Sequence, residues 1–415
     1  MLHRLNLGAA IAALGLLGMT SAAVAQTDAC GEKKMSKKLE KPLAAAQASR
    51  GTKNWQEMLN KANEADAVPV GKTEFDKFWI HEFRGIAKAN LKQYAEAITE
   101  LEASLTSPCM EETDKPGRTK LLEQLSYQSK DYPKAITYGK RAYDATGDID
   151  VGIYLGNAYY ITNDFENSKK VIGEVVTKLE TSGKSPDEQT YRILQSACLN
   201  LKDNQCVVDQ MEKLVLHYPK PSYWQDLTNS MMRVSASDRE LLNILRLADG
   251  VDVMNQGSEF TEMAQLSLGA GLPGEAQAML EKGLQKNVFT SEREKSLATR
   301  LLAEAKQAVT LDKSTLDKQD ASAKAKVTGD SDVKLGAAYL SYNEVDKAIE
   351  ALQRGIGKGG VKNPDEAGLL LGIALMRADK KPEAAKAFAT VTKDPALVRI
   401  AKLWVFKAST VAAPG

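Results

Sequence analysis

The chain has 415 residues, and its 55 Lys and Arg balance its 54 Asp and Glu. A neutral chain offers no broad basic surface, which argues against nucleic acid or an anionic membrane as its partner. The length is ample for a large core, either as two ordinary domains or as one extended solenoid.

Residues 1–25 are predicted to be a signal peptide. Arg4 gives a positive flank, an apolar run follows from Leu7 to Leu17, and Ala23-Val24-Ala25 forms a small-x-small cleavage site before Gln26. A membrane anchor is the competing interpretation, but the apolar run is short for a bilayer. We therefore expect export to the periplasm, with no membrane insertion after the signal is cleaved.

The cysteines are even in number and all lie in the mature part: Cys30, Cys109, Cys198 and Cys206. In an exported protein this favours disulfides over free thiols or a metal site. Cys198 and Cys206 flank an expected turn between antiparallel helices, which brings their Cα atoms within disulfide distance. We expect them to pair, leaving Cys30 with Cys109 to join an N-terminal hairpin to the end of the first repeat.

An internal repeat runs through the rest of the chain. Four times, a Gly lies twelve positions before a small residue that opens the next apolar run: Gly85 and Ala97, Gly156 and Ser168, Gly336 and Ala348, Gly372 and Ala384. With Ala135, Val207 and Ala276 as further anchors, the period is near ~34 residues. Apolar residues recur at three and four positions, which predicts helices, and nothing alternates long enough to form a sheet.

In period and in the placing of small residues, these units resemble tetratricopeptide repeats over most of the mature chain. Two units depart from the pattern, because Glu123 and Gln195 stand where the first small residue belongs. The resemblance implies an all-α fold, a right-handed superhelical solenoid of antiparallel helix pairs. We expect Gly85, Gly156, Gly336 and Gly372 to be buried where paired helices cross.

The chain as a whole is similar to exported multi-repeat tetratricopeptide proteins of Gram-negative bacteria, some described as accessories of TonB-type uptake systems. The similarity lies in phrases such as Lys41-Pro42-Leu43-Ala44-Ala45, Tyr132-Pro133-Lys134-Ala135-Ile136 and Gly271-Leu272-Pro273-Gly274-Glu275-Ala276. No residue marks coupling to TonB itself.

Five segments are expected: the signal peptide (1–25), an N-terminal helical cap (26–72), four repeats (73–222), degenerate helical repeats (223–330) and two C-terminal repeats (331–410). The cap is predicted to be a helical hairpin with Trp55 and Leu59 as its apolar contacts. Asp131, Asn163 and Asp203 are placed at turns between paired helices. The segment from Asp312 to Asp332 is either a helix or a flexible joint, and its Ala and Lys favour the helix.

The first helix of each tetratricopeptide unit lines a concave groove. Projected onto this chain, the groove residues are Glu82, Asn90, Lys120, Gln124, Tyr127, Asn157, Tyr160 and Arg192. This polar and aromatic set suits an extended peptide. The family's carboxylate clamp is not expected, because Gln124 and Tyr154 stand where its asparagines belong.

No catalytic, metal or cofactor constellation is predicted. His81-Glu82 lacks the second His that would complete a zinc-binding pair. The glycine run from Gly355 to Gly360 follows a helix rather than a strand and reads as a helix end. The favoured function is a non-enzymatic periplasmic scaffold that binds a protein or peptide. The alternative is an enzyme or enzyme subunit acting on cell-wall or polysaccharide material, which would need paired carboxylates in a cleft.

Overall fold

The computed structural model describes residues 29–409, in which 21 helices and no strand are formed. The all-α prediction is therefore confirmed for this part of the chain. The expected signal peptide lies outside the described residues. The chain divides into two compact units, residues 1–162 and 163–415, and each is described by itself. No described helix is both long and apolar enough to cross a bilayer.

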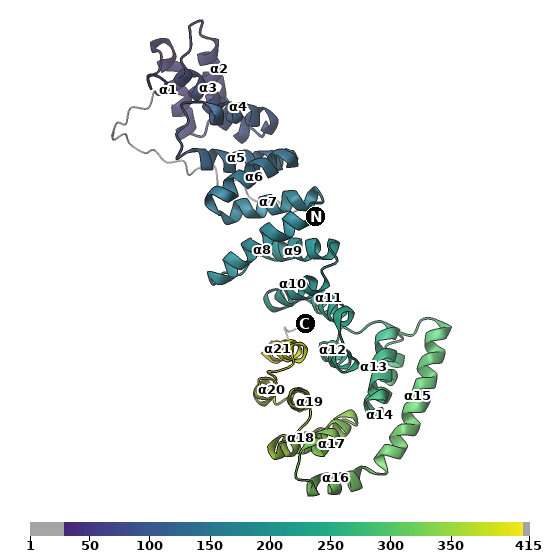
Figure 1. The fold of residues 1–415 in the computed structure, drawn as a ribbon. Coiled ribbons are helices and arrows are strands. Elements are labelled where there is room, and N and C mark those ends of the chain that lie inside the picture. The colour runs from purple at the N-terminus through teal and green to yellow at the C-terminus, as the bar shows by residue number, and fades with distance from the viewer. Residues whose placement is uncertain (1–28, 410–415) are drawn as a thin grey trace. The chain divides into compact units, whose positions relative to one another are not determined.

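The first unit is a stack of antiparallel helices, each packed on the next (Figure 1). Its helices are α1 (Lys37–Gly51), α2 (Trp55–Ala67), α3 (Glu74–Asn90), α4 (Tyr94–Thr106), α5 (Lys115–Gln128), α6 (Tyr132–Thr146) and α7 (Ile149–Ile161). Helices α1 and α2 form the predicted N-terminal hairpin. Leu59 is buried in its core, and Trp55 packs against that core.

Close helix crossings occur where the repeat places its small residues. A Cβ atom on Gly85 would lie 2.6 Å from the side chain of Leu101, and one on Gly336 would lie 2.6 Å from that of Leu352. Gly372 meets Phe388 in the same way, and Gly156 is also buried. A larger residue would force the paired helices apart, which explains why Gly recurs at this register.

The turns between paired helices share one geometry. A residue with left-handed backbone conformation comes first, and a capping residue follows it. Asp131 and Asp203 are such caps, accepting hydrogen bonds from backbone N–H groups of their helices at 3.2 and 3.1 Å. Asn163 lies at such a turn, as predicted, but it does not cap the helix: it takes the left-handed position with φ 63°, and the adjacent Asp164 is the cap.

The second unit contains the remaining helices. They are α8 (Phe165–Thr181), α9 (Glu188–Asn200), α10 (Asn204–His217), α11 (Pro221–Val234), α12 (Asp238–Gly250), α13 (Gly257–Gly269), α14 (Pro273–Gln285), α15 (Glu292–Lys313), α16 (Leu316–Ala325), α17 (Asp330–Ser341), α18 (Val345–Lys358), α19 (Pro364–Arg377), α20 (Lys381–Phe388) and α21 (Pro395–Ser409). The segment from Asp312 to Asp332 is thus mostly helical, as favoured from its composition.

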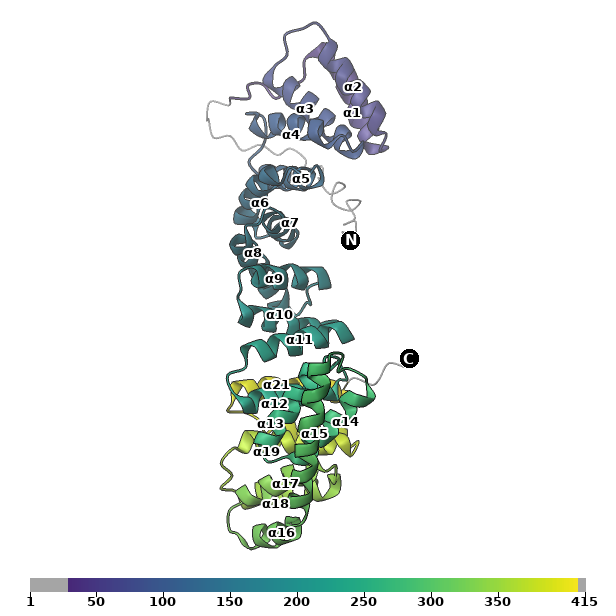
Figure 2. The same cartoon turned by 90° about the vertical axis from the view of Figure 1, so that its right-hand side faces the viewer.

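Within the second unit the chain turns back on itself. Helix α15 leads away to α16, and the later helices return until α21 packs against α12 (Figures 1 and 2). Gly250 leaves room for the ring of Trp404, and Arg239 bonds to Asp394 at 2.8 Å. Helix α14 also packs directly on α17, so the helices before and after the α15–α16 segment are in contact with each other.

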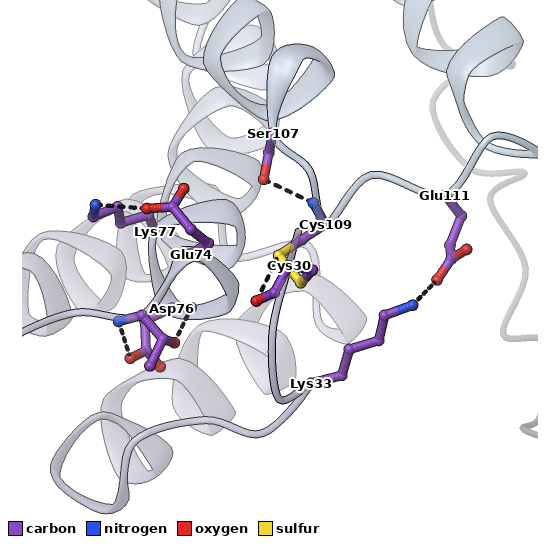
Figure 3. The surroundings of a disulfide bond; sticks show 9 residues. Cys30, Lys33, Glu74, Asp76, Lys77, Ser107, Cys109 and Glu111 are labelled. Atoms are coloured by element: carbon purple, nitrogen blue, oxygen red, sulfur yellow. Dashed lines mark hydrogen bonds and ion pairs between the residues drawn. A yellow bond between two sulfur atoms is a disulfide. The ribbon is translucent and has the colours of Figure 1, made fainter. Parts of the chain in front are cut away.

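The cysteines lie in the two expected pairs, both at disulfide distance. The Cα atoms are 4.8 Å apart for Cys30 and Cys109, and 5.8 Å apart for Cys198 and Cys206. The first pair joins the segment before α1 to the segment after α4 (Figure 3). An ion pair between Lys33 and Glu111, at 2.6 Å, lies beside it.

Candidate partner-binding site

Lysine and tyrosine side chains from α5 and α7 meet on one face of the first unit. Lys120 Nζ lies 2.7 Å from Asp148 Oδ2 and 3.4 Å from Asp150 Oδ2. Seven residues further along α5, the Tyr127 ring packs edge-on against Tyr154 at a centroid distance of 5.2 Å. We call Lys120, Tyr127, Asp150 and Tyr154 the α5–α7 face.

Both tyrosines of this face remain neutral at physiological pH. Burial raises the pKa of Tyr127 to about 12, and the nearby Tyr132 and Tyr154 add to the effect. The pKa of Tyr154 is raised by burial and by the charge of Asp150. Within residues 29–409 neither hydroxyl has a hydrogen-bond partner in the protein, so both phenols can donate to a bound molecule.

Lys120 supplies a fixed positive charge. Burial acts to lower its pKa, but the hydrogen bond and the charge of Asp148 outweigh burial and leave the pKa raised. The Asp150 side chain is 72% exposed, so its carboxylate faces solvent beside the ammonium group. The α5–α7 face therefore offers a cation, a carboxylate, two hydroxyls and two aromatic rings, which are the groups that recognise a peptide segment.

The other predicted groove residues take different places. Glu82 is buried in an ion pair with Arg118, and Gln124 and Asn157 are also buried. Asn90 donates to the carbonyl oxygen of Ile86 in its own helix at 2.8 Å.

Tyr160, the last predicted groove residue of the first unit, is half-buried. Arg192 is exposed on α9 in the second unit. Asp150 was missed, and Tyr154 was named only as a departure from the clamp pattern. Their spacing of four, with Asn157 three positions further on, places all three on one helical face.

Glu123 occupies a helix crossing where the repeat otherwise has a small residue. Gly139 stands opposite it, at the register position that Leu101 and Leu352 hold in their pairs, so a glycine and a large residue have exchanged places. Neither carboxyl oxygen of Glu123 has a hydrogen-bond partner among residues 29–409. Burial raises its pKa to about 9, so the group is protonated at neutral pH.

Two other buried carboxylates are held by cations of the protein. Glu275 accepts two hydrogen bonds from the Arg246 guanidinium at 2.9 and 2.7 Å. Burial acts to raise the pKa of Glu275, but Arg246 outweighs it and leaves the pKa lowered. Asp332 is held in the same manner by Arg354 and Lys358, at 2.6 and 2.8 Å. Each of these carboxylates is therefore neutralised inside the fold. No cluster of metal-ligating side chains occurs in the described part of the chain.

A cavity of about 1070 Å³ lies in the second unit, and sequence reasoning did not find it. It is lined by residues of α12, α13, α16, α17 and α19, by Asp312 of α15, and by residues of the adjoining loops. These helices belong largely to the stretch where the repeat is degenerate. The cavity arises because the chain turns back between α15 and α21. No spacing of residues along the sequence predicts that this turn occurs.

No family model matches the chain, and no curated protein matches it in sequence. Among solved structures it is similar to the C-terminal part of a TPR repeat-containing protein from Cytophaga hutchinsonii, at 14% identity, with 65% of this chain and 98% of that chain covered and a TM-score of 0.37. The TPR2AB domain of yeast Sti1 in its pHSP90 complex shares 13% identity over 72% of this chain and all of that chain, with a TM-score of 0.25. RapI in its apo form shares 13% sequence identity over 78% of this chain and all of that chain, with a TM-score of 0.32.

The sequence identities and TM-scores of these matches are low, so we base the fold assignment on the helices of this chain and on the way they cross. The repeated approach of Gly85 to Leu101 and of Gly336 to Leu352 is the geometry expected of stacked helix pairs in a tetratricopeptide-like solenoid.

Proposed function

We propose that the protein is a non-enzymatic scaffold of the periplasm, of the exported tetratricopeptide type found in Gram-negative bacteria. Its α5–α7 face holds a segment of a protein partner. The observation that carries this proposal is that Lys120 and Tyr127, seven residues apart on α5, both face the α7 side, where Tyr127 packs against Tyr154. Tyr160, in the same unit, remains a candidate for a further contact with the partner, and Arg192, in the second unit, stays a separate prediction.

Two features support the periplasmic location. The cysteine pairs at disulfide distance suit an oxidising compartment. The first 25 residues have the sequence of a cleaved signal. Among the described residues, the buried carboxylates other than Glu123 are bound by cations, as Glu275 is, or by backbone N–H groups, as Asp365 is. No pair of them favours the alternative of an enzyme acting on cell-wall or polysaccharide material.

A binding experiment with matched variants tests the proposal. Lys120→Gln, Tyr127→Phe and Tyr154→Phe together remove the charge and both hydroxyls but keep the ring packing. The control carries Lys140→Gln, Tyr94→Phe and Tyr138→Phe, the same changes on α4 and α6.

The mature protein is immobilised and exposed to an envelope extract. The face variant should lose the proteins that wild type retains, and the control should keep them. Retention of the same proteins by both variants would remove the α5–α7 face from the proposal, and turnover of peptidoglycan by purified wild type would favour the enzyme.

A further inference from the structure

Helix α16 is weakly buried compared with α17, the helix on which it packs. Two of its ten residues, Leu316 and Ala323, are buried, whereas seven of the twelve residues of α17 are. Val327, directly after α16, is 89% exposed. Helices in proteins owe most of their stability to the packing of an apolar face, and α16 has little of it. We therefore expect α16 to open locally while the helices around it stay folded.

Charged groups of α18 hold α16 in place. Arg354 donates a hydrogen bond to Asp320 at 2.8 Å, and both side chains of this ion pair are partly exposed. Lys358 donates to the carbonyl oxygens of Ala323 and Lys324 at 2.8 and 3.1 Å. Partly exposed contacts of this kind contribute little stability and are weakened by salt. The attachment of α16 therefore depends on ionic strength more than the apolar packing of α17 on α18 does.

The chain on either side of α16 is tied to the neighbouring helices. Before it, Asp312 accepts a hydrogen bond from the Tyr342 hydroxyl at 2.7 Å, which joins the end of α15 to the end of α17. After it, the N–H group of Gly329 donates to the carbonyl oxygen of Gly359 at 2.7 Å. Residues 314–328 thus lie between two tied points, and we call them the α16 strap.

One side of the α16 strap forms a wall of the cavity. Its lining residues are spaced at three and four positions, as one side of a helix requires: Thr315, Lys318, Gln319, Ser322 and Lys326. Asp320, on another side of the helix, points to Arg354 of α18. Movement of the α16 strap away from α17 and α18 therefore opens the cavity along this wall.

We propose that the α16 strap is a salt-sensitive gate of the cavity in the second unit. It opens between its two tied ends while α17 and α18 stay packed, and its opening widens the entrance to the cavity. Low ionic strength favours the closed state, because it strengthens the contacts of Arg354 and Lys358 with the strap. This device is separate from the α5–α7 face and does not depend on a partner bound there.

Cysteine labelling of the full mature protein measures the opening. Ala323→Cys places a thiol at a position of the strap that is 2% exposed, so a thiol reagent reacts with it only in the open state. The rate is divided by that of an unstructured peptide of the same sequence at the same salt concentration. We expect the normalised rate to be about fivefold higher in about 1 M sodium chloride than in about 0.05 M.

Paired variants locate the cause. Asp320→Asn removes the carboxylate of the strap that Arg354 holds and should raise the labelling rate at position 323 about fivefold. The control, Glu350→Gln, also removes a carboxylate partner of Arg354, but one that lies on α18 itself, 3.2 Å from the guanidinium. It should leave the rate within about twofold. Circular dichroism checks that both variants remain folded.

A second thiol tests whether the opening reaches the cavity. Ala338 lines the cavity from α17 and is 8% exposed. It lies one helical turn before Tyr342, which bonds to Asp312 at the start of the strap. Labelling of Ala338→Cys should rise with salt and with Asp320→Asn, as labelling at position 323 does.

The proposal is overturned if labelling at position 323 does not respond to salt, or if Asp320→Asn and Glu350→Gln change it to the same extent. A response at position 323 without one at position 338 would show a mobile helix that does not gate the cavity. Hydrogen exchange of α17 that accelerates together with that of α16 would assign the opening to the whole unit, which also contradicts a local gate.

Discussion

Replacing Glu123 by Gln should stabilise the first unit in a pH-dependent way. In the native state burial holds the pKa of this carboxyl at about 9, against an ordinary value of 4.5. Between those values the unfolded state releases the proton and the native state keeps it, so native stability falls as pH rises. The loss is about 1.4 kcal/mol per pH unit, or about 3 kcal/mol at pH 7. A neutral amide of nearly the same shape avoids this cost.

Hydrogen exchange of α5 peptides, followed by mass spectrometry between pH 5.5 and 8, measures the effect. The free energy of opening should be higher in Glu123→Gln than in wild type, and the difference should grow by about 1.4 kcal/mol for each pH unit. Glu96→Gln, at an exposed carboxyl of α4, is the control and should show no such trend. An equal pH dependence in wild type and Glu123→Gln would refute an ionisation cost at this site.

Three further changes should destabilise the protein through separate mechanisms. Gly336→Leu overpacks a helix crossing and should cost roughly 1–3 kcal/mol in urea unfolding; an unchanged midpoint would contradict the proposed register. Arg246→Ala leaves Glu275 buried without its cation and should cost about 3–5 kcal/mol, whereas Arg246→Lys should restore part of the loss. Reducing the Cys30–Cys109 bond, which closes a span of 79 residues, should cost about 2–4 kcal/mol; a melting temperature that did not respond to reductant would count against that bond.

The helix pairs were predictable because their signals are local. Gly85 and Gly336 mark crossings that depend only on a fixed offset between two neighbouring helices, and Asp131 caps a helix that follows it directly in sequence. The same logic extends to Cys198 and Cys206, which face each other across a single turn. Interactions of this kind are encoded within one repeat.

The return of α21 to α12 was not predictable. Arg239 pairs with Asp394, 155 residues away, and neither residue carries a sequence pattern that distinguishes it from other surface charges. The cavity depends on that return, so it stayed hidden as well. The sequence showed that Glu123 departs from the repeat. It did not show that Gly139, on the partner helix, leaves the room that the larger Glu123 side chain needs.

Several of the predicted groove residues are buried, which the sequence did not reveal. A helical register places residues on a face but does not show how deeply that face is covered. Glu82 was projected towards the groove, yet its carboxylate is taken by Arg118, which comes from the next helix pair. Lys120 and Tyr127, by contrast, are only half-buried, so their polar groups remain accessible.

Photo-crosslinking in cells that produce the protein tests the scaffold function most directly. Benzoylphenylalanine replaces the exposed Asp150 on the α5–α7 face or, as a control, the exposed Thr137 on α6. If this face holds a partner, position 150 should yield a discrete adduct with another protein and position 137 should yield none. The absence of an adduct at position 150, or the same adduct at both positions, would contradict the proposed function.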